Sequence, residues 1–460
     1  MASNQLIQRA GSVRVKQSKP GALNVAWKDP KAVTRFVTVM MWLLVFIMIT
    51  PQGFDYEGKG GMPTSSDLLS KVIWMILLFG SLAIVGARIS RAKKLLAEMN
   101  PFLLLFLGLA FASYLWSIEP AISFRRALRA FTIMAACFSF ALVGWNRYRY
   151  EDVLRTILTT ITVLSIVFVI VAPDMAVHRT AQAETNNAWH GVTIGKNVLG
   201  SLASGSLLLW LNGYMSRAIR PAKALLGAAP AALCLVMTRS ATSIMATVFT
   251  LLFMMILLRS PGTLKRYMPY LVALFATVIL IYVFAMLRLV PGSEILLQPI
   301  TMLTGKDLTF TGRTSIWEIL NQNIHAHPWL GTGYGAYWIG ATPNSPSYEM
   351  LLKLYYYPSE GHNGYLDVLN DLGRVGMACL IAYFVSYIKQ GLQLMKLDRY
   401  KGGLFLAVLF RGFLADMSES HWFSALAIDF ALMTLATMSL GRALYEARLN
   451  HARELSRATS

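Results

Sequence analysis

Residues 35–51 read RFVTVMMWLLVFIMITP, an apolar run whose only charge is Arg35 at its start. The hydrocarbon core of a bilayer is about 30 Å thick and takes about 17 to 25 helical residues to cross. The run is therefore long enough to span a membrane as one helix. Runs of the same kind recur along most of the chain, so this stretch sets the fold class.

The composition of the whole chain is that of an integral membrane protein. Of its 460 residues 55% are hydrophobic and only 14% are charged, whereas soluble domains carry about 25% charged residues. The apolar runs are spread evenly between residues 35 and 441, so we expect one membrane domain. Cys137, Cys234 and Cys379 all lie inside apolar runs, which excludes a disulfide framework in an outer loop.

Twelve stretches are long and apolar enough to be read as spans, although the seventh, eighth and eleventh are short or interrupted. The predicted fold class is an all-α polytopic membrane protein with one large outward loop that contains short helices. The predicted spans are residues 35–51, 68–87, 100–116, 123–145, 153–172, 197–214, 222–237, 241–258, 268–288, 365–388, 402–418 and 422–441.

The predicted organisation has three parts. Residues 1–34 are polar and are expected to form a disordered cytoplasmic tail without a cleavable signal peptide. Residues 35–441 form the transmembrane domain, with the periplasmic loop at residues 289–364. Residues 442–460 form a second cytoplasmic tail.

Positive charges gather in alternate connections between the predicted spans. Seven segments hold 28 of the 42 Lys and Arg residues of a chain whose net charge is +19. Cytoplasmic connections of membrane proteins carry such an excess, so we expect both termini in the cytoplasm. A nucleic-acid-binding chain needs a contiguous basic face, which these short turns do not form. The segments are the N-terminal tail to Arg35, residues 88–94, 147–155, 217–223, 259–266 and 389–401, and the tail from Arg442.

The remaining 14 basic residues lie within predicted spans or on their outward side. A charged side chain in the middle of a span costs at least about 2.5 to 3.5 kcal/mol, so it normally faces a cavity and serves a function. Several arginines at one face predict an anionic ligand. These residues are Lys59, Lys71, Arg125, Arg126, Arg129, Arg179, Lys196, Arg239, Arg288, Lys306, Arg313, Lys353, Arg374 and Arg411.

The connection of residues 289–364 is the one long outward loop of this topology. Structureless loops longer than about 15 residues are uncommon unless they are functional. Its sequence TSIWEILNQNIHAHPW places Ile316, Leu320 and Ile324 at helical spacing before Pro328, which predicts a short amphipathic helix. The turn-rich GTGYGAYW follows. The many Trp and Tyr side chains of the loop suit stacking on sugar rings, and an interfacial aromatic belt is the alternative.

Two motifs dominate this region, TGRTSIWEILNQNIHAHPWLGTGYGAYW at residues 311–338 and EGHNGYLDVLNDLGRVG at residues 360–376. Three more precede them along the chain: SYLWSIEPAISFRRAL, WHGVTIGKNVLG and TRSATS. In this order they resemble the signature of the O-antigen ligase and polysaccharide polymerase superfamily, which includes WaaL, Wzy and ExoQ-like proteins. The chain departs from the family pattern at two positions. Thr193 replaces a phenylalanine, and Gly195 stands where a histidine is frequent.

The resemblance implies a helical glycosyltransferase of the bacterial inner membrane with its active site at the periplasmic face. Members of the family move a glycan from a polyprenyl diphosphate carrier to a saccharide hydroxyl. The expected partners are the carrier-linked donor, a saccharide acceptor and the lipid bilayer, with no nucleic acid. No cofactor and no metal are expected, because the chain shows neither a His-x-x-x-His pair nor a carboxylate cluster.

Three residues are predicted to be catalytic. The lipid diphosphate gains charge as it leaves, so fixed cations stabilise the transition state, and arginine holds phosphate oxygens with two donors at once. By the resemblance, Arg239 and Arg313 match the essential arginines of the family, with interfacial snorkelling as the alternative. His362 resembles the catalytic histidine, which takes the proton of the acceptor hydroxyl. A histidine that caps the following helix is the alternative.

Six residues are predicted to bind substrate. Arg125, Arg126 and Arg129 begin one span, where they hold a phosphate or pair with Glu119. Lys196 and Asn197 begin another span, where free backbone N–H groups also favour an anion. Glu419 completes the set, which is Arg125, Arg126, Arg129, Lys196, Asn197 and Glu419.

Several acidic and basic neighbours keep two interpretations. His325, His327 and Glu360 are rivals of His362 for the role of the base. Asp416 and Glu419 either orient Arg411 or the acceptor, or form an ordinary buried ion pair. Asp367 and Asp371 are expected to act as dipole partners at the start of their helix.

Two functions of different classes fit a chain with about twelve spans. A secondary transporter shows two matching halves and ionisable residues near the midplane. This sequence shows no internal repeat, and its ionisable residues crowd the outward side, which favours the enzyme. Within the enzyme class, the WSIEP segment and the Ser-Glu pair at residues 418–419 favour a polymerase over a ligase that uses lipid A core.

Overall fold

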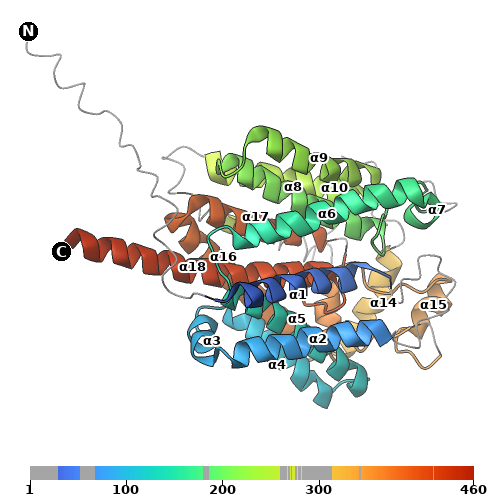
Figure 1. Ribbon diagram of the computed structural model, residues 1–460. Helices are drawn as coiled ribbons and strands as arrows, with labels where there is room; N and C mark the ends of the chain where they lie inside the picture. The colour runs from blue at the N-terminus through green and yellow to red at the C-terminus, as the bar shows by residue number, and fades with distance from the viewer. Residues whose placement is uncertain are drawn as a thin grey trace, which may run out of the picture.

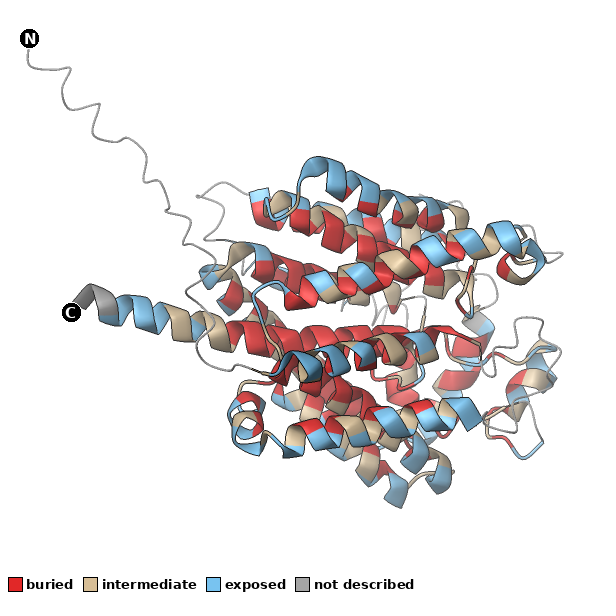
Figure 2. Cartoon of the chain, in the orientation of Figure 1, coloured by how far each residue is buried: buried red, intermediate tan, exposed pale blue. Residues whose placement is uncertain are grey.

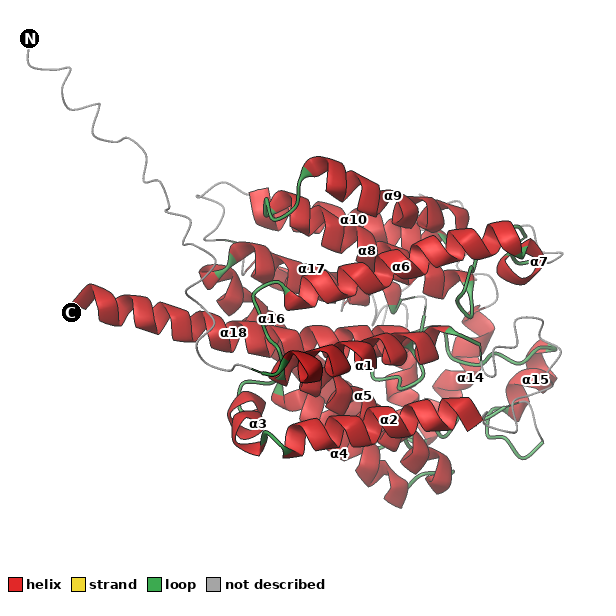
Figure 3. Ribbon diagram, viewed as in Figure 1, coloured by secondary structure: helices red, strands yellow, loops and turns green. Residues whose placement is uncertain are grey.

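The computed structural model of the protein is helical throughout the part that it describes. Figure 3 shows helices joined by loops, with no strand among the described residues. A single bridge pairs Val177 with Trp189. The predicted all-α class is therefore confirmed. The described residues are 29–51, 68–179, 186–259, 313–340, 343–417 and 419–459, with a few positions between 267 and 281.

Three predictions fall largely outside the described residues: the tail of residues 1–34, the span of residues 268–288 and the first part of the loop of residues 289–364. The other eleven predicted spans each overlap a helix. Ten described helices precede the long connection: α1 (Lys31–Ile49), α2 (Leu68–Gly86), α3 (Ile89–Leu96), α4 (Pro101–Ala112), α5 (Pro120–Leu142), α6 (Arg149–Val171), α7 (Pro173–Ala176), α8 (Lys196–Met215), α9 (Pro221–Met237) and α10 (Ala241–Arg259). Five more are described in the C-terminal part, the first two of them within that connection: α14 (Arg313–Ala326), α15 (Tyr348–Leu354), α16 (Gly364–Leu397), α17 (Arg399–Ala415) and α18 (Ile428–Thr459).

Fewer of the described helices are long and apolar enough to cross a membrane than the twelve spans that were predicted. Five described helices, α1, α2, α6, α10 and α16, are long and apolar enough to cross a membrane. The pair Ile89–Leu96 and Pro101–Leu115, bent by 104°, makes a sixth if it is one broken span. Helix α5 has three arginines near its start and α17 is only 17 residues long. The count of twelve is therefore not confirmed.

Helices α16, α17 and α18 form the middle of the bundle (Figure 1). On one side α5 and α4 pack against α18 and α16, with α1 and α2 packed on α5. On the other side α10 and α8 pack against α17, with α6 and α9 packed on α8. Figure 2 shows buried residues toward this middle and exposed residues on the outer faces. Exposed apolar side chains such as Phe79, Ile170 and Leu226 fit a chain surrounded by lipid.

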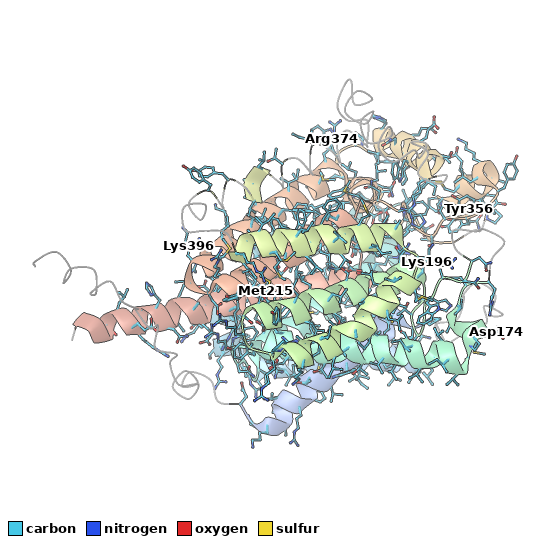
Figure 4. All side chains as sticks on the ribbon, turned by 90° about the horizontal axis from the view of Figure 1, so that it is seen from above. Asp174, Lys196, Met215, Tyr356, Arg374 and Lys396 are labelled. Atoms are coloured by element: carbon cyan, nitrogen blue, oxygen red, sulfur yellow. The ribbon has the colours of Figure 1, made fainter. Side chains whose placement is uncertain are left out.

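The two ends of the bundle differ. Figure 4 shows Lys196, Tyr356 and Asp174 toward one end, and Met215 and Lys396 toward the other. The end with Lys196 carries α14 and α15, the two short helices of the long loop (Figure 1). Helix α14 covers the stretch that the hydrophobic spacing predicted to be amphipathic. At the other end α18 continues past Arg442 to Thr459, so the predicted C-terminal tail extends the last helix.

Helix α16 is broken at Gly373. The backbone of this residue lies at φ 62° and ψ −158°, a conformation that a side chain would not allow. Because the helix is interrupted, the carbonyl groups of Asn370 and Asp371 lack their helical partners. They accept instead from the N–H groups of Thr332 and Gly333, at 2.9 and 3.0 Å.

The segment of residues 328–333 forms backbone hydrogen bonds with α16 on both sides of this break. Beyond Gly373 the N–H groups of Arg374 and Val375 donate to the carbonyl groups of Pro328 and Trp329, at 3.0 and 3.2 Å. The break therefore exposes no unpaired backbone groups at these four positions, as membrane proteins require of irregular backbone. The first nine residues of α16 are thereby fixed to the loop that follows α14.

Candidate active site

A cavity of about 690 Å³ opens at the end of the bundle that carries the long loop. Four parts of the chain form most of its wall: the start of α8, the start of α16 with the residues before it, the turn of residues 334–338 and the connection of residues 419–428 between α17 and α18. Arg126 of α5 and His178 complete it. Five of the nine residues predicted for the site line it. These are Arg126, Lys196, Asn197, His362 and Glu419.

His362 directly precedes Asn363, the capping residue of α16, and lies between two carboxylates. Its Nδ1 atom is 3.1 Å from Oε1 of Glu360 and 3.7 Å from Oε2 of Glu419. Asn363, and not His362, caps the helix, because its side chain accepts from the N–H groups of Tyr365 and Leu366. The capping role that was the alternative for His362 is therefore excluded.

The backbone of His362 is in the left-handed region, at φ 49°. Few residues other than glycine adopt this conformation, and such strained residues gather at functional sites. The side chain keeps 29% of its surface exposed. Since Nδ1 faces the carboxylates, Nε2 is the ring nitrogen that is available to a ligand in the cavity.

Glu419 joins three of the predicted residues. Its Oε1 accepts a hydrogen bond from Nδ2 of Asn197 at 2.6 Å and one from Arg313 at 3.3 Å. Its Oε2 faces His362. Asn197 in turn accepts from the hydroxyl of Ser240 at 2.9 Å. Glu419 therefore connects the start of α8, the start of α14, the residue before α16 and the residues before α10.

The charges of this cluster depend on one another. Burial works to lower the pKa of His362, but Glu360 and Glu419 outweigh it and raise that pKa to about 9. Burial raises the pKa of Glu360. Burial acts in the same direction on Glu419, yet His362 and Arg313 lower its pKa on balance. Glu419 is therefore the carboxylate that stays ionised beside a protonated His362.

The start of α8 presents positive charge to the cavity, in contrast to the two carboxylates beside His362. Residues 194–198 line the cavity, and Lys196 is the first residue of the helix. The N–H groups of the first helical turn have no partners within the helix, and the helix dipole places positive charge there. Together with the Lys196 ammonium they favour an anion at this wall. No side chain stands at Gly195, where an added Cβ would meet open space.

Arg239 lies beside the cavity without lining it. Its side chain is exposed, and one guanidinium nitrogen donates to the carbonyl group of Asn186 at 3.0 Å. Its backbone, at φ 50°, is also left-handed. The next residue, Ser240, bonds Asn197. Arg239 is therefore next in the chain to Ser240, which belongs to the hydrogen-bonded cluster around Glu419.

The three arginines of α5 do not act together in the structure. Arg126 donates to the carbonyl groups of Gly335 and Trp338, at 2.6 and 2.7 Å, and so holds the turn that forms a wall of the cavity. Arg129 lies over the ring of Trp74, with its guanidinium carbon 4.7 Å from the ring centre. Arg125 is exposed and donates within its own helix. Neither Arg125 nor Arg129 lines the cavity, so their predicted substrate contact is without structural support.

Residues 226–381 match a family model described as O-Antigen ligase. The matched part of the chain is similar to the O-antigen ligase and polysaccharide polymerase superfamily. It is also 30% identical over 100 residues to the Exopolysaccharide production protein ExoQ of Rhizobium meliloti (strain 1021). That alignment covers 21% of this chain and 22% of the relative. The resemblance read from the motifs is thus confirmed.

The region that matches the O-antigen ligase model contains Arg239, Arg313 and His362. In the cavity, His362 meets residues that lie outside this matched region. His325 and His327, the rivals of His362, are exposed and do not line the cavity. Glu360, the third rival, does line it.

Sequence reasoning did not assign a role to His421, which lines the cavity two residues after Glu419. Its Nδ1 lies 3.8 Å from Asp416 and 3.7 Å from Asp429. Burial works to lower the pKa of His421, but Asp429 and Asp416 raise it on balance. Arg411 pairs with Asp429. The proposal that Asp416 or Glu419 orients Arg411 is therefore wrong, and the motif DMSESHW alone carried no sign of Asp429.

The sequence spacing predicted no carboxylate cluster, and this prediction is wrong because the fold brings two carboxylates together beside His362. Glu360, His362 and Glu419 offer ligand atoms within 4.8 Å of one another, close enough to hold a metal ion. Their charges, however, already have protein partners, because Arg313 contacts Glu419 and His362 faces both carboxylates. A cation would compete with these partners. Metal independence of the family's reaction remains a prediction for this chain.

Proposed function

We propose that the protein is a metal-independent glycosyltransferase of the bacterial inner membrane, with both termini in the cytoplasm. It moves a glycan from a polyprenyl diphosphate carrier to a saccharide acceptor at the periplasmic face. The observation that carries this proposal is the shared cavity. There, a histidine flanked by two carboxylates faces the same space as the start of α8.

The start of α8 is the proposed site of the diphosphate. The N–H groups of its first turn, which have no partners within the helix, and Lys196 present positive charge to the cavity. When the glycosidic bond to the carrier breaks, the diphosphate leaves with the electron pair and gains negative charge. Fixed donors that are already in place stabilise this charge. Arg313, which pairs with Glu419, and Arg239, which directly precedes Ser240, add to the positive field or close on the diphosphate when the donor binds.

His362 is the proposed base. Its Nε2 takes the proton of the acceptor hydroxyl as the oxygen attacks the anomeric carbon. Glu360 and Glu419 hold the ring by Nδ1 and stabilise the imidazolium that forms. With a pKa of about 9 the histidine is mostly protonated at neutral pH. The neutral base is therefore the minor form in the free enzyme, so the rate should increase at alkaline pH.

A polymerase is the proposed member of this class, with a carrier-linked repeat unit as the acceptor. The WSIEP and Ser-Glu segments support it, and so does the similarity to a protein named for exopolysaccharide production. A ligase that uses lipid A core is the alternative. A transporter is the alternative of another class, and it is less well supported because the charged cavity lies at one end of the bundle.

Reconstitution with defined acceptors tests the proposal. The purified protein in liposomes would receive a labelled polyprenyl diphosphate glycan with either a second carrier-linked unit or lipid A core. Longer carrier-linked chains support a polymerase, and labelled lipid A core supports the ligase instead. Deletion of the gene, with separate analysis of lipopolysaccharide and secreted polysaccharide, assigns the acceptor in the cell. Movement of label across the membrane without any new glycosidic bond would overturn the enzyme.

A further inference from the structure

The carboxylate of Asp367 stands between His362 and the turn that follows α14. Its Oδ1 accepts a hydrogen bond from the indole N–H of Trp338 at 2.9 Å. Its Oδ2 accepts one from the backbone N–H of Gly361 at 3.0 Å. Each oxygen thus holds a different segment. The sequence predicted only a dipole role for this residue.

The turn that carries Trp338 is a fixed support. Arg126 donates to the carbonyl groups of Gly335 and Trp338, and the carboxylate of Asp371 accepts from the N–H group of Gly335 at 2.7 Å. Gly335 is left-handed, at φ 67°, and an added Cβ would lie 2.4 Å from Cδ of Arg126. The turn is also fastened into the break of α16. Asp367 therefore connects Gly361 to a rigid part of the molecule.

The carboxylate of Asp367 also lies close to the backbone of Gly361. A Cβ added to Gly361 would lie 2.7 Å from Oδ1 of Asp367 and 2.8 Å from Cδ1 of Leu320. Glycine at this position lets the carboxylate reach the backbone directly before His362. The backbone of His362 is strained, at φ 49°, and a strained residue keeps its conformation only where its surroundings hold it. The bond from Gly361 to Asp367 is one such hold.

We propose that Asp367 is a positioning residue that fixes His362 through the backbone of Gly361, with Trp338 as the anchor of its second oxygen. This inference rests on the proposed role of His362 as the base. Asp367 exchanges no proton with the substrate in this account. It sets where Nε2 of His362 stands relative to the acceptor hydroxyl, and it leaves the diphosphate site at α8 unchanged.

Two variants separate this role from other roles. Trp338→Phe removes the indole donor and keeps an aromatic, though smaller, ring at this buried position. Asp367→Asn replaces one acceptor oxygen with an NH₂ group that opposes an N–H donor. Trp329→Phe is the matched control, because Trp329 lies in the same loop, is 63% exposed and does not line the cavity. Each purified variant would be assayed for kcat, for donor KM, for photocrosslinking to a polyprenyl diphosphate probe and for Tm.

A misplacement of about 1 Å can cost about 100-fold in rate. We expect Asp367→Asn to lower kcat about 10- to 100-fold and Trp338→Phe by a smaller factor, with donor crosslinking and Tm kept and the control at the wild-type rate. A loss of donor crosslinking in Asp367→Asn would show direct donor contact and overturn the proposal. So would a wild-type rate in Trp338→Phe. If Asp367→Asn does not fold, Trp338→Phe still tests the proposal.

The double variants distinguish failure of this inference from failure of the proposed function. In a His362→Gln background, Asp367→Asn should cause no further loss, because its effect passes through the histidine. A further loss would show that Asp367 acts independently and would overturn the inference. If His362→Gln alone turned over at the wild-type rate, the proposed base would be wrong, and the inference would be overturned with it.

Discussion

Replacing Glu419 by Gln removes the ionised carboxylate that faces His362. The Oε2 atom of Glu419 lies 3.7 Å from Nδ1 of His362. Gln keeps the size of the side chain and one oxygen, which can still accept from Asn197, as Oε1 does at 2.6 Å. Glu360 remains beside the ring, 3.1 Å from Nδ1, so part of the rise in the pKa of His362 is kept. The substitution therefore acts on the charge state of His362 and also removes the ion pair with Arg313.

The size of the effect follows from the distance. Two unit charges at this separation interact by about 1 kcal/mol in water and by about 4.5 kcal/mol at an effective dielectric constant of about 20. One pKa unit corresponds to about 1.4 kcal/mol. The pKa of His362, about 9 in the wild type, should therefore fall by about 1 to 3 units. Because the neutral imidazole is the base, kcat rises with pH through this pKa, and the rising limb should move to lower pH.

Initial rates of glycan transfer between pH 6 and pH 10 measure this shift at saturating donor. Glu318→Gln is the matched control, because it removes an exposed carboxylate of α14 that does not line the cavity. The wild type and the control should reach half of their maximal rate near pH 9, and the Glu419 variant near pH 6 to 8. An unchanged rising limb in the variant, or a wild-type rate that falls with pH, would refute the coupling of Glu419 to the base.

Three further predictions concern the cations, the metal and the turn. Arg313→Lys and Arg239→Lys should each lower transfer by at least about tenfold with normal membrane insertion, because the charge stays but the two-donor geometry is lost; near-normal polymer yield would exclude a phosphate clamp. A chelator should leave transfer intact, whereas loss that magnesium or manganese restores would show that Glu360, His362 and Glu419 hold a cation. Gly335→Ala should lower the free energy of unfolding by about 1 to 3 kcal/mol, because Cβ meets Arg126 at φ 67°. Thermal melts would check this against Gly86→Ala, whose Cβ meets open space; equal Tm values would contradict it.

Features that depend on residues close in sequence were predictable. Apolar runs marked the helices because a bilayer demands long unbroken stretches, and the spacing of Ile316, Leu320 and Ile324 marked α14. The motifs marked His362 and Arg313, which the structure joins through Glu419. The number of membrane crossings was less predictable, since charged or short helices such as α5 and α17 fail a test by length and composition.

Features that depend on distant segments were not predictable. The break at Gly373 is stabilised by hydrogen bonds with residues about 40 positions earlier, so a helical pattern continues through it in the sequence. Arg126 resembles a phosphate ligand until the structure shows that its donors bind two carbonyl groups. Glu360 and His362 are neighbours in the sequence, but only the fold brings the distant Glu419 to them, and spacing along the chain cannot reveal it.

The most direct test of the account compares His362→Ala with the wild type in two assays on purified protein. One is photocrosslinking of a polyprenyl diphosphate donor, and the other is formation of glycan product. Removal of a general base costs about 10²- to 10⁴-fold in rate, so product should fall by that factor while crosslinking at the start of α8 persists. Product formation at the wild-type rate would contradict the account. So would a loss of crosslinking together with product, which would mean that His362 holds the donor or the fold.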